Sequence, residues 1–115
     1  MTSQPDDTES NTVEPIVAVK LISGEELVAR LLVAKCSQSN IALAQPFAVG
    51  MVPSGNSMAL SMMPFMPYAD EDDLKCMIIA ATGFITIVGV SQSMADAYNE
   101  RTGRIVVARP KIVVN

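Results

Sequence analysis

The sequence predicts a small, mainly β domain, built as a barrel of short antiparallel strands, and three observations support this. The stretch from Val17 to Val33 reads as a strand, a tight turn and a second strand. The later apolar segments are short and are broken by Gly, Pro, Asn and Ser. Only 2 Tyr and 3 Phe occur among 115 residues, so aliphatic side chains and Met must fill the core.

The chain divides into three parts. Residues 1–14 are polar and carry acidic residues but no basic one, which predicts a disordered acidic arm. Residues 15–103 are expected to form one domain, because a chain of this length makes a single core. Residues 104–115 form a C-terminal tail and are a candidate for an extra edge strand.

The first half of the domain is predicted to hold four strands. The first spans about Ile16–Ile22 and the second about Glu26–Lys35, joined by a two-residue turn at Ser23–Gly24. The third, Ile41–Val52, is expected to bend at its Pro and Gly residues. The fourth, Met58–Met66, should lie at a sheet edge or a bend, since Pro64 has no amide to donate to a ladder.

The second half is predicted to hold β structure followed by a helix. Asp70–Asp73 is expected to be a solvated loop, and the strand-like segments Leu74–Ala80 and Phe84–Val90 meet at a turn at Thr82–Gly83. A helix is predicted over about 93–102. Its start is assigned to Ser93, with Asp96 completing a box-like cap, and Gly103 is a natural stop.

Composition argues against catalysis. The chain has no His, which removes the usual general base near neutral pH and the commonest metal ligand. No nucleophile, phosphate-cradle or dinucleotide motif is present. We therefore expect no enzyme activity, no metal and no cofactor, and we interpret Cys36 and Cys76 as reduced thiols in or near the core. The formal net charge of −4 gives no long-range attraction for nucleic acid.

The fourth predicted strand is unusually rich in Met. Met side chains fill irregular gaps in a core, and they also line adaptable contact surfaces, so both core filling and a subunit interface remain open. The uncharged segments Ile41–Ala69 and Cys76–Ala95 are interrupted by Pro or too short to form a spanning helix. We therefore expect no membrane insertion.

Taken together, these features resemble the Sm-like fold, and they look closest to small Sm-like proteins of tailed bacteriophages, especially cyanophages. The resemblance covers about Val17 to Arg101. It is carried by Val19–Glu26 (VKLISGEE), by Pro64–Pro67 (PFMP) before an acidic loop, and by Met94–Tyr98 (MADAY) in the closing helix.

The resemblance implies a strongly bent, five-stranded antiparallel open barrel, of Sm-like or SH3-like type, with one short C-terminal helix. It also implies a homo-oligomeric ring in which the fourth strand of one subunit pairs with the fifth of its neighbour. Such pairing removes exposed sheet edges. The implied subunit interface comprises Met58, Leu60, Met62, Met63, Phe65, Phe84, Ile85 and Ile87.

Sm-like rings usually bind RNA through two loops around the pore. The corresponding residues here are Ser37, Gln38 and Asn40 in one loop and Thr82 and Gly83 in the other. The second loop lacks the cation that the family usually carries before this glycine, and stacking aromatics are missing from both loops.

Two functions follow from the sequence. One is a ring-forming module that binds single-stranded RNA of phage or host transcripts in the cytoplasm, which is the host cytoplasm for a phage protein. The other is a non-catalytic structural or protein-interaction ring that does not bind nucleic acid.

Overall fold

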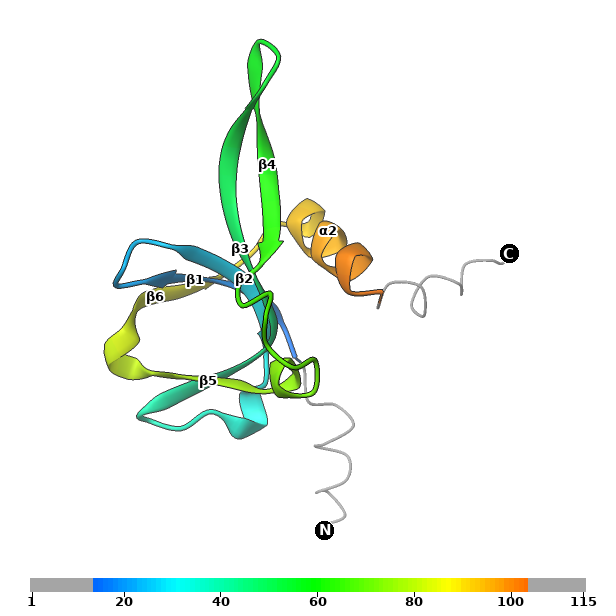
Figure 1. Cartoon of the computed structure of the whole chain (residues 1–115). Coiled ribbons are helices and arrows are strands. Elements are labelled where there is room, and N and C mark those ends of the chain that lie inside the picture. The colour runs from blue at the N-terminus through cyan, green and yellow to red at the C-terminus, as the bar shows by residue number, and fades with distance from the viewer. Residues whose placement is uncertain (1–13, 104–115) are drawn as a thin grey trace.

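The computed structural model describes residues 14–103 (Figure 1). The predicted acidic arm, apart from Glu14, and the predicted C-terminal tail fall on residues 1–13 and 104–115 and lie outside the described residues.

One antiparallel sheet, bent but not closed, makes up most of the described chain, and it confirms the predicted open barrel (Figure 1). The strands lie in the order β4-β3-β2-β1-β6, and β5 pairs separately with β3. The sheet has six strands rather than five, because β4 and β5 both pair with β3 but are separate strands, divided by residues 65–76. The strands are β1 (Ile16–Leu21), β2 (Glu26–Leu31), β3 (Asn40–Ser54), β4 (Ser57–Pro64), β5 (Met77–Ala80) and β6 (Phe84–Gly89).

The β1–β2 connection differs from the predicted two-residue turn. The Leu21 amide donates to the Glu25 carbonyl at 2.8 Å, and the Gly24 amide donates to the Leu21 carbonyl at 2.9 Å. Three residues therefore lie inside the loop, and Gly24 takes a positive φ of 107°. This is the three-residue hairpin in which a Gly follows a turn and forms a bulge. The prediction that Gly24 takes a positive φ is confirmed, but the predicted loop length of two residues was wrong.

Strand β2 ends four residues earlier than predicted. The chain turns at Leu32 into a short 3₁₀ helix, η1 (Val33–Lys35). Leu32 is 7% exposed and packs with Ala42 and Ala44 of β3, while its amide donates to the Ala42 carbonyl. This hydrophobic anchor turns the chain back onto β3, so that Val33 and Lys35 face solvent.

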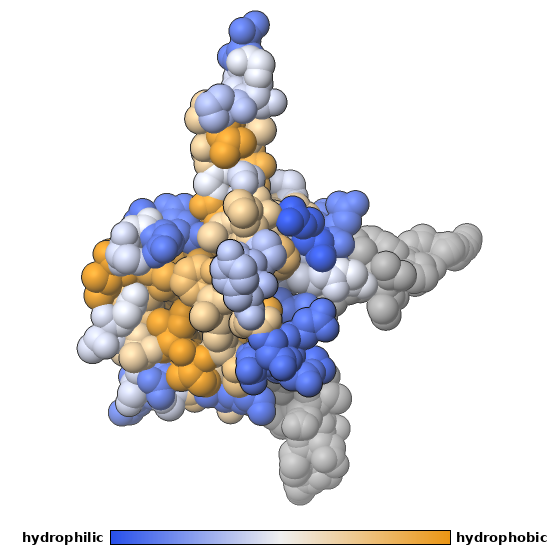
Figure 2. Space-filling view, in the orientation of Figure 1, coloured by the Kyte–Doolittle hydropathy of each residue, from blue (hydrophilic) through white to orange (hydrophobic). Residues whose placement is uncertain are grey.

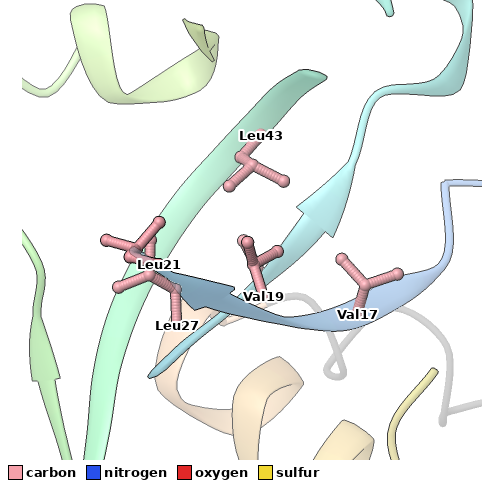
Figure 3. Close-up of a cluster of buried hydrophobic side chains, with 6 residues drawn as sticks. Val17, Val19, Leu21, Leu27 and Leu43 are labelled. Carbon is pink, nitrogen blue, oxygen red and sulfur yellow. The ribbon is translucent and has the colours of Figure 1, made fainter. Parts of the chain in front are cut away.

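The barrel core comes from the alternation of β1. Val17, Val19 and Leu21 point to one face, where Leu27 of β2 and Leu43 of β3 meet them (Figure 3). Leu27 and Leu43 are 0% exposed. Each side chain of this size stabilises the fold by about 1.5–3 kcal/mol through burial.

Strand β3 bends sharply at Gln45, next to the predicted bend at Pro46. The β2–β3 register shifts between Val28 and Arg30, so β3 carries an extra residue there. Gln45 has a φ of +48°, a backbone conformation that costs a non-glycine residue about 1–2 kcal/mol. The bulge turns the rest of β3 away from the barrel.

Helix α2 (Gln92–Thr102) holds this bend in place. Tyr98 is fully buried, and its hydroxyl donates to the Ala44 carbonyl at 2.7 Å and lies 3.1 Å from the Gln45 carbonyl. Its ring meets Phe47 edge to face, with 5.9 Å between the ring centroids. The helix thereby fixes the point at which β3 leaves the barrel.

The ends of α2 confirm the predicted helix but correct its start. The N-cap is Ser91, whose hydroxyl accepts from the Met94 amide at 3.2 Å. Ser93 lies within the first turn instead. Gly103 ends the helix with a φ of 78°, as predicted.

Beyond Val49, β3 pairs only with β4, and the two strands form a hairpin that projects from the barrel (Figure 1). Ser54 pairs directly with Ser57, so the hairpin has a two-residue turn at Gly55–Asn56. Gly55 takes a φ of 64° in this turn. Strand β4 lies at the edge of the sheet, as Pro64 predicted. We call residues 50–61 the projecting hairpin.

Candidate functional site

Three loops meet at one end of the barrel and bring the two predicted RNA-binding segments together. Asn40 pairs with Ala80, and the Ala81 amide donates to the Ser39 carbonyl at 2.7 Å. The Ile22 amide of the β1–β2 loop donates to the Gly83 carbonyl at 3.1 Å. Segments more than forty positions apart in sequence are thus joined by backbone hydrogen bonds. We call residues 37–40 and 81–83 the loop pair.

The first loop is shaped by Ser37. Its hydroxyl accepts from the amides of Ser39 and Asn40, both at 3.2 Å, and its own amide donates to the Asn40 carbonyl at 2.9 Å. A short polar side chain of this kind stabilises a tight turn by replacing backbone partners. Gln38 is exposed and Asn40 half-buried. Within residues 14–103, neither side-chain amide has a hydrogen-bond partner, so both can contact a ligand.

The second loop is the 3₁₀ helix η3 (Ala81–Gly83), which links β5 to β6. Thr82 is exposed, and Gly83 is half-buried with 3.4 Å between an added Cβ and the Ile79 Cγ2. An added Cβ at this distance would make ordinary van der Waals contact with β5, and exposed Thr82 directly follows Ala81, which bonds to the first loop.

Charge around the loop pair is sparse. Lys35 ends η1 just before Ser37, and Glu25 lies in the β1–β2 loop that bonds to Gly83. Sequence reasoning missed Lys35, because it was assigned to the end of a strand. Lys35 lies in η1, two residues before the loop pair begins. It is the one positively charged residue within residues 21–25, 33–40 and 81–83 at this end of the barrel.

The predicted subunit-interface residues separate into two groups of four, one exposed and one packed within the subunit. Four are exposed, with exposed fractions between 46% and 64%: Met58, Leu60, Met63 and Ile85. Met62 is 8% exposed and packs with Val28 and Tyr98 inside the subunit. Phe65, Phe84 and Ile87 are half-buried against the barrel core. Met62 is thus a core residue, and the first group is available for contact.

Strands β4 and β6 form the two ends of the strand order, so each has one neighbour within the described sheet. The Phe65 amide donates to the Pro46 carbonyl, which fixes the ladder so that Met58 and Leu60 point their backbone groups outward. The Leu21–Glu25 bond fixes the β1 ladder in the same way, and it leaves Ile87 of β6 pointing outward. Both edges offer unpaired donors and acceptors.

A cavity of about 400 Å³ lies where the hairpin base, the acidic loop and the end of α2 meet. Phe47, Pro64, Lys75 and Arg101 are among its lining residues. Arg101 donates to the Met62 carbonyl at 2.8 Å and lies 5.3 Å from the Phe47 ring centroid. Its guanidinium is therefore engaged in holding α2 against the hairpin base.

The two thiols lie in different surroundings. Cys36 is half-buried, with its Sγ 3.4 Å from both the Leu32 carbonyl and the Ala42 amide. Cys76 is exposed, which corrects the expectation of a thiol in or near the core. Within residues 14–103, no group of three or more His, Cys, Asp or Glu is placed to hold a metal ion.

Residues 14–103 thus form an all-β open barrel with a polar loop pair at one end and open strand edges that include those of β4 and β6. No protein-family model matches the chain, and no curated protein matches it either. None of the helices in residues 14–103 has the length and hydropathy required to cross a membrane.

Proposed function

We propose that the chain is a ring-forming, Sm-like module that binds single-stranded RNA with its loop pair. The observation that carries this proposal is the hydrogen bond between Ser39 and Ala81, which brings together the two segments that the resemblance assigns to RNA. They are distant in sequence, and each presents polar groups to solvent.

Ring formation is supported by the two sheet edges. A sheet with two bare apolar edges aggregates unless the edges are covered, and pairing β4 with β6 of the next copy covers both at once. Exposed Met58 and Leu60 on one edge and Ile85 on the other would then lie across the new ladder. This contact repeats head to tail from copy to copy, and the proposal requires that the rotation between neighbours closes into a ring rather than an open filament.

RNA binding is supported by the chemistry of the loop pair. The amides of Gln38 and Asn40 can donate to and accept from the edges of unstacked bases, and Lys35 can contact a phosphate. One cation per subunit is weak alone, but a ring repeats it around the axis. The proposal places the protein in the cytoplasm, in the host cell for a phage protein.

A second candidate is a structural or protein-interaction ring without nucleic-acid contacts. The net charge of −4 favours it, and so does the carboxylate of Glu25, which follows the loop that bonds to Gly83 through Ile22, because both repel phosphates. The loop pair also lacks aromatic side chains on which bases could stack.

Native mass spectrometry with and without short U-rich or A-rich RNA tests both candidates at once. The RNA proposal predicts a closed oligomer that gains oligonucleotide at low salt and loses it as salt rises. Asn40→Ala should weaken binding several-fold. Asn56→Ala, the same change in the distant hairpin turn, should leave binding unchanged. A ring that binds no oligonucleotide at tens of micromolar in low salt would overturn the RNA proposal and support the second candidate.

A further inference from the structure

The projecting hairpin has two chemically different faces. Side chains alternate along each strand, and directly paired residues share a face. Met51 pairs with Leu60 and Pro53 with Met58, so these four apolar residues lie on one face. The opposite face is smaller and more polar, and it is formed by Gly50, Val52, Ser54, Ser57, Ala59 and Ser61. We call the first set the apolar hairpin face.

Helix α2 covers only the base of this face. Met62 and Val49, the next residues along it, pack with Tyr98. Farther out, Met51, Met58 and Leu60 are 57%, 55% and 46% exposed. Figure 2 shows hydrophobic surface part of the way along the hairpin, well clear of the barrel. The face that α2 begins to bury thus continues uncovered toward the turn.

The apolar hairpin face needs another surface packed against it. Two antiparallel strands alone are at best marginally stable in water, and they become stable when a face is buried. No charged residue occurs from Ile41 to Ala69, so the ribbon offers nothing to a charged partner. The occupant must itself be apolar, uncharged and flat. The same face of another copy has all three properties.

The position of the apolar hairpin face also suits packing against a second copy of the chain. The hairpin projects away from the barrel, so two hairpins can overlap without a clash between barrels (Figure 1). The face is distinct from the β4 edge, whose backbone groups lie in the plane of the sheet. A face contact and an edge contact can therefore exist in one assembly.

We propose that the apolar hairpin faces of two copies pack against each other across a two-fold axis, joining two rings hairpin to hairpin. The inference rests on the proposed ring. The five residue pairs beyond Val49 form a strip only about 17 Å long and two strands wide, with the strands about 4.8 Å apart, so one face is much smaller than the about 800 Å² per partner of a standard interface. A ring presents several faces together, and their combined contact is stable.

Sedimentation velocity of the full chain tests this with two neighbouring substitutions. Met51→Asp places a charge on the apolar hairpin face, whereas Val52→Asp places the same charge on the opposite face of the same strand. Both residues are exposed, so neither change opens the core. We expect the wild type and Val52→Asp to share one mass, and Met51→Asp to have half of it.

The outcomes separate this inference from the ring itself. A single ring whose mass Met51→Asp leaves unchanged overturns the face contact and retains the ring. Equal effects of Met51→Asp and Val52→Asp also overturn it. A monomeric wild type overturns both proposals, whereas a dimer that Met51→Asp splits supports the face contact without a ring. Circular dichroism of each variant verifies that it remains folded.

Discussion

The barrel and the projecting hairpin are built from the same alternating strands, yet they differ in what lies across each face. In the barrel, Val17, Val19 and Leu21 of β1 pack with residues of β2 and β3, where Leu27 and Leu43 are 0% exposed. In the hairpin, Met51 and Met58 alternate in the same way but remain 57% and 55% exposed, beyond the part of the face that packs with Tyr98 of α2. Alternation alone therefore determines which residues share a face of the sheet. Whether the subunit buries that face depends on the bend at Gln45, which turns the hairpin away from the barrel.

The largest expected effect contrasts one buried residue with one exposed residue. Leu27→Ala leaves a cavity in the barrel core and should lower the free energy of unfolding by about 2–5 kcal/mol. Met58→Ala removes a half-exposed side chain from the hairpin and should change it by no more than about 0.5 kcal/mol per subunit. Urea unfolding at low protein concentration measures both. Equal losses would contradict the division between barrel and hairpin.

Tyr98→Phe tests the link between the two regions. The change keeps the ring against Phe47 but removes the only hydroxyl donor to the Ala44 and Gln45 carbonyls within the described residues. Loss of one such intramolecular hydrogen bond costs about 0.5–1.5 kcal/mol. Thermal unfolding should show this loss. An unchanged melting temperature would mean that α2 does not hold the bend.

Ser91→Ala tests the corrected helix start. Loss of an N-cap hydroxyl should lower the free energy of unfolding by about 1 kcal/mol. Ser93→Ala is the matched control, and it should have a much smaller effect, since Ser93 is not the cap and its hydroxyl makes only an exposed 3.3 Å bond with the Ser91 hydroxyl. The reverse order of effects in urea unfolding would restore the cap predicted from sequence.

Gln45→Gly should have the smallest effect, and it should be stabilising. Glycine relieves the cost of a φ of +48°, while its greater freedom in the unfolded chain offsets part of the gain. The 3.4 Å bond from Arg30 to the Gln45 side chain is long and contributes little. We expect a rise of less than about 1 kcal/mol in the free energy of unfolding. A clear loss would show that the bend needs the glutamine side chain.

The sequence was sufficient for features that depend on local chemistry. Pro64 predicted an edge strand because it lacks an amide, and Gly103 predicted the helix end because it tolerates a left-handed conformation. The open barrel followed from alternation and turn residues. The pairing of the two candidate loops was implied by a family resemblance, and local pattern alone did not predict it.

Other features depend on contacts distant in sequence, and local patterns could not predict them. The burial of Met62 follows from the position of Tyr98, thirty-six residues later. The early end of β2 follows from Leu32 packing on β3, although the sequence there continues in a strand-like pattern. The choice of Ser91 over Ser93 depends on where β6 ends, and both serines suit a cap equally well.

Amide hydrogen exchange along β4, measured on the full chain at the concentration where it assembles, tests the central claim most directly. The Ala59 amide points into the ladder with β3, whereas the Met58 and Leu60 amides point outward. If a neighbouring copy pairs with this edge, Met58 and Leu60 will exchange as slowly as Ala59. Exchange of both at the rate of an exposed loop, with Ala59 still protected, would contradict edge-to-edge assembly.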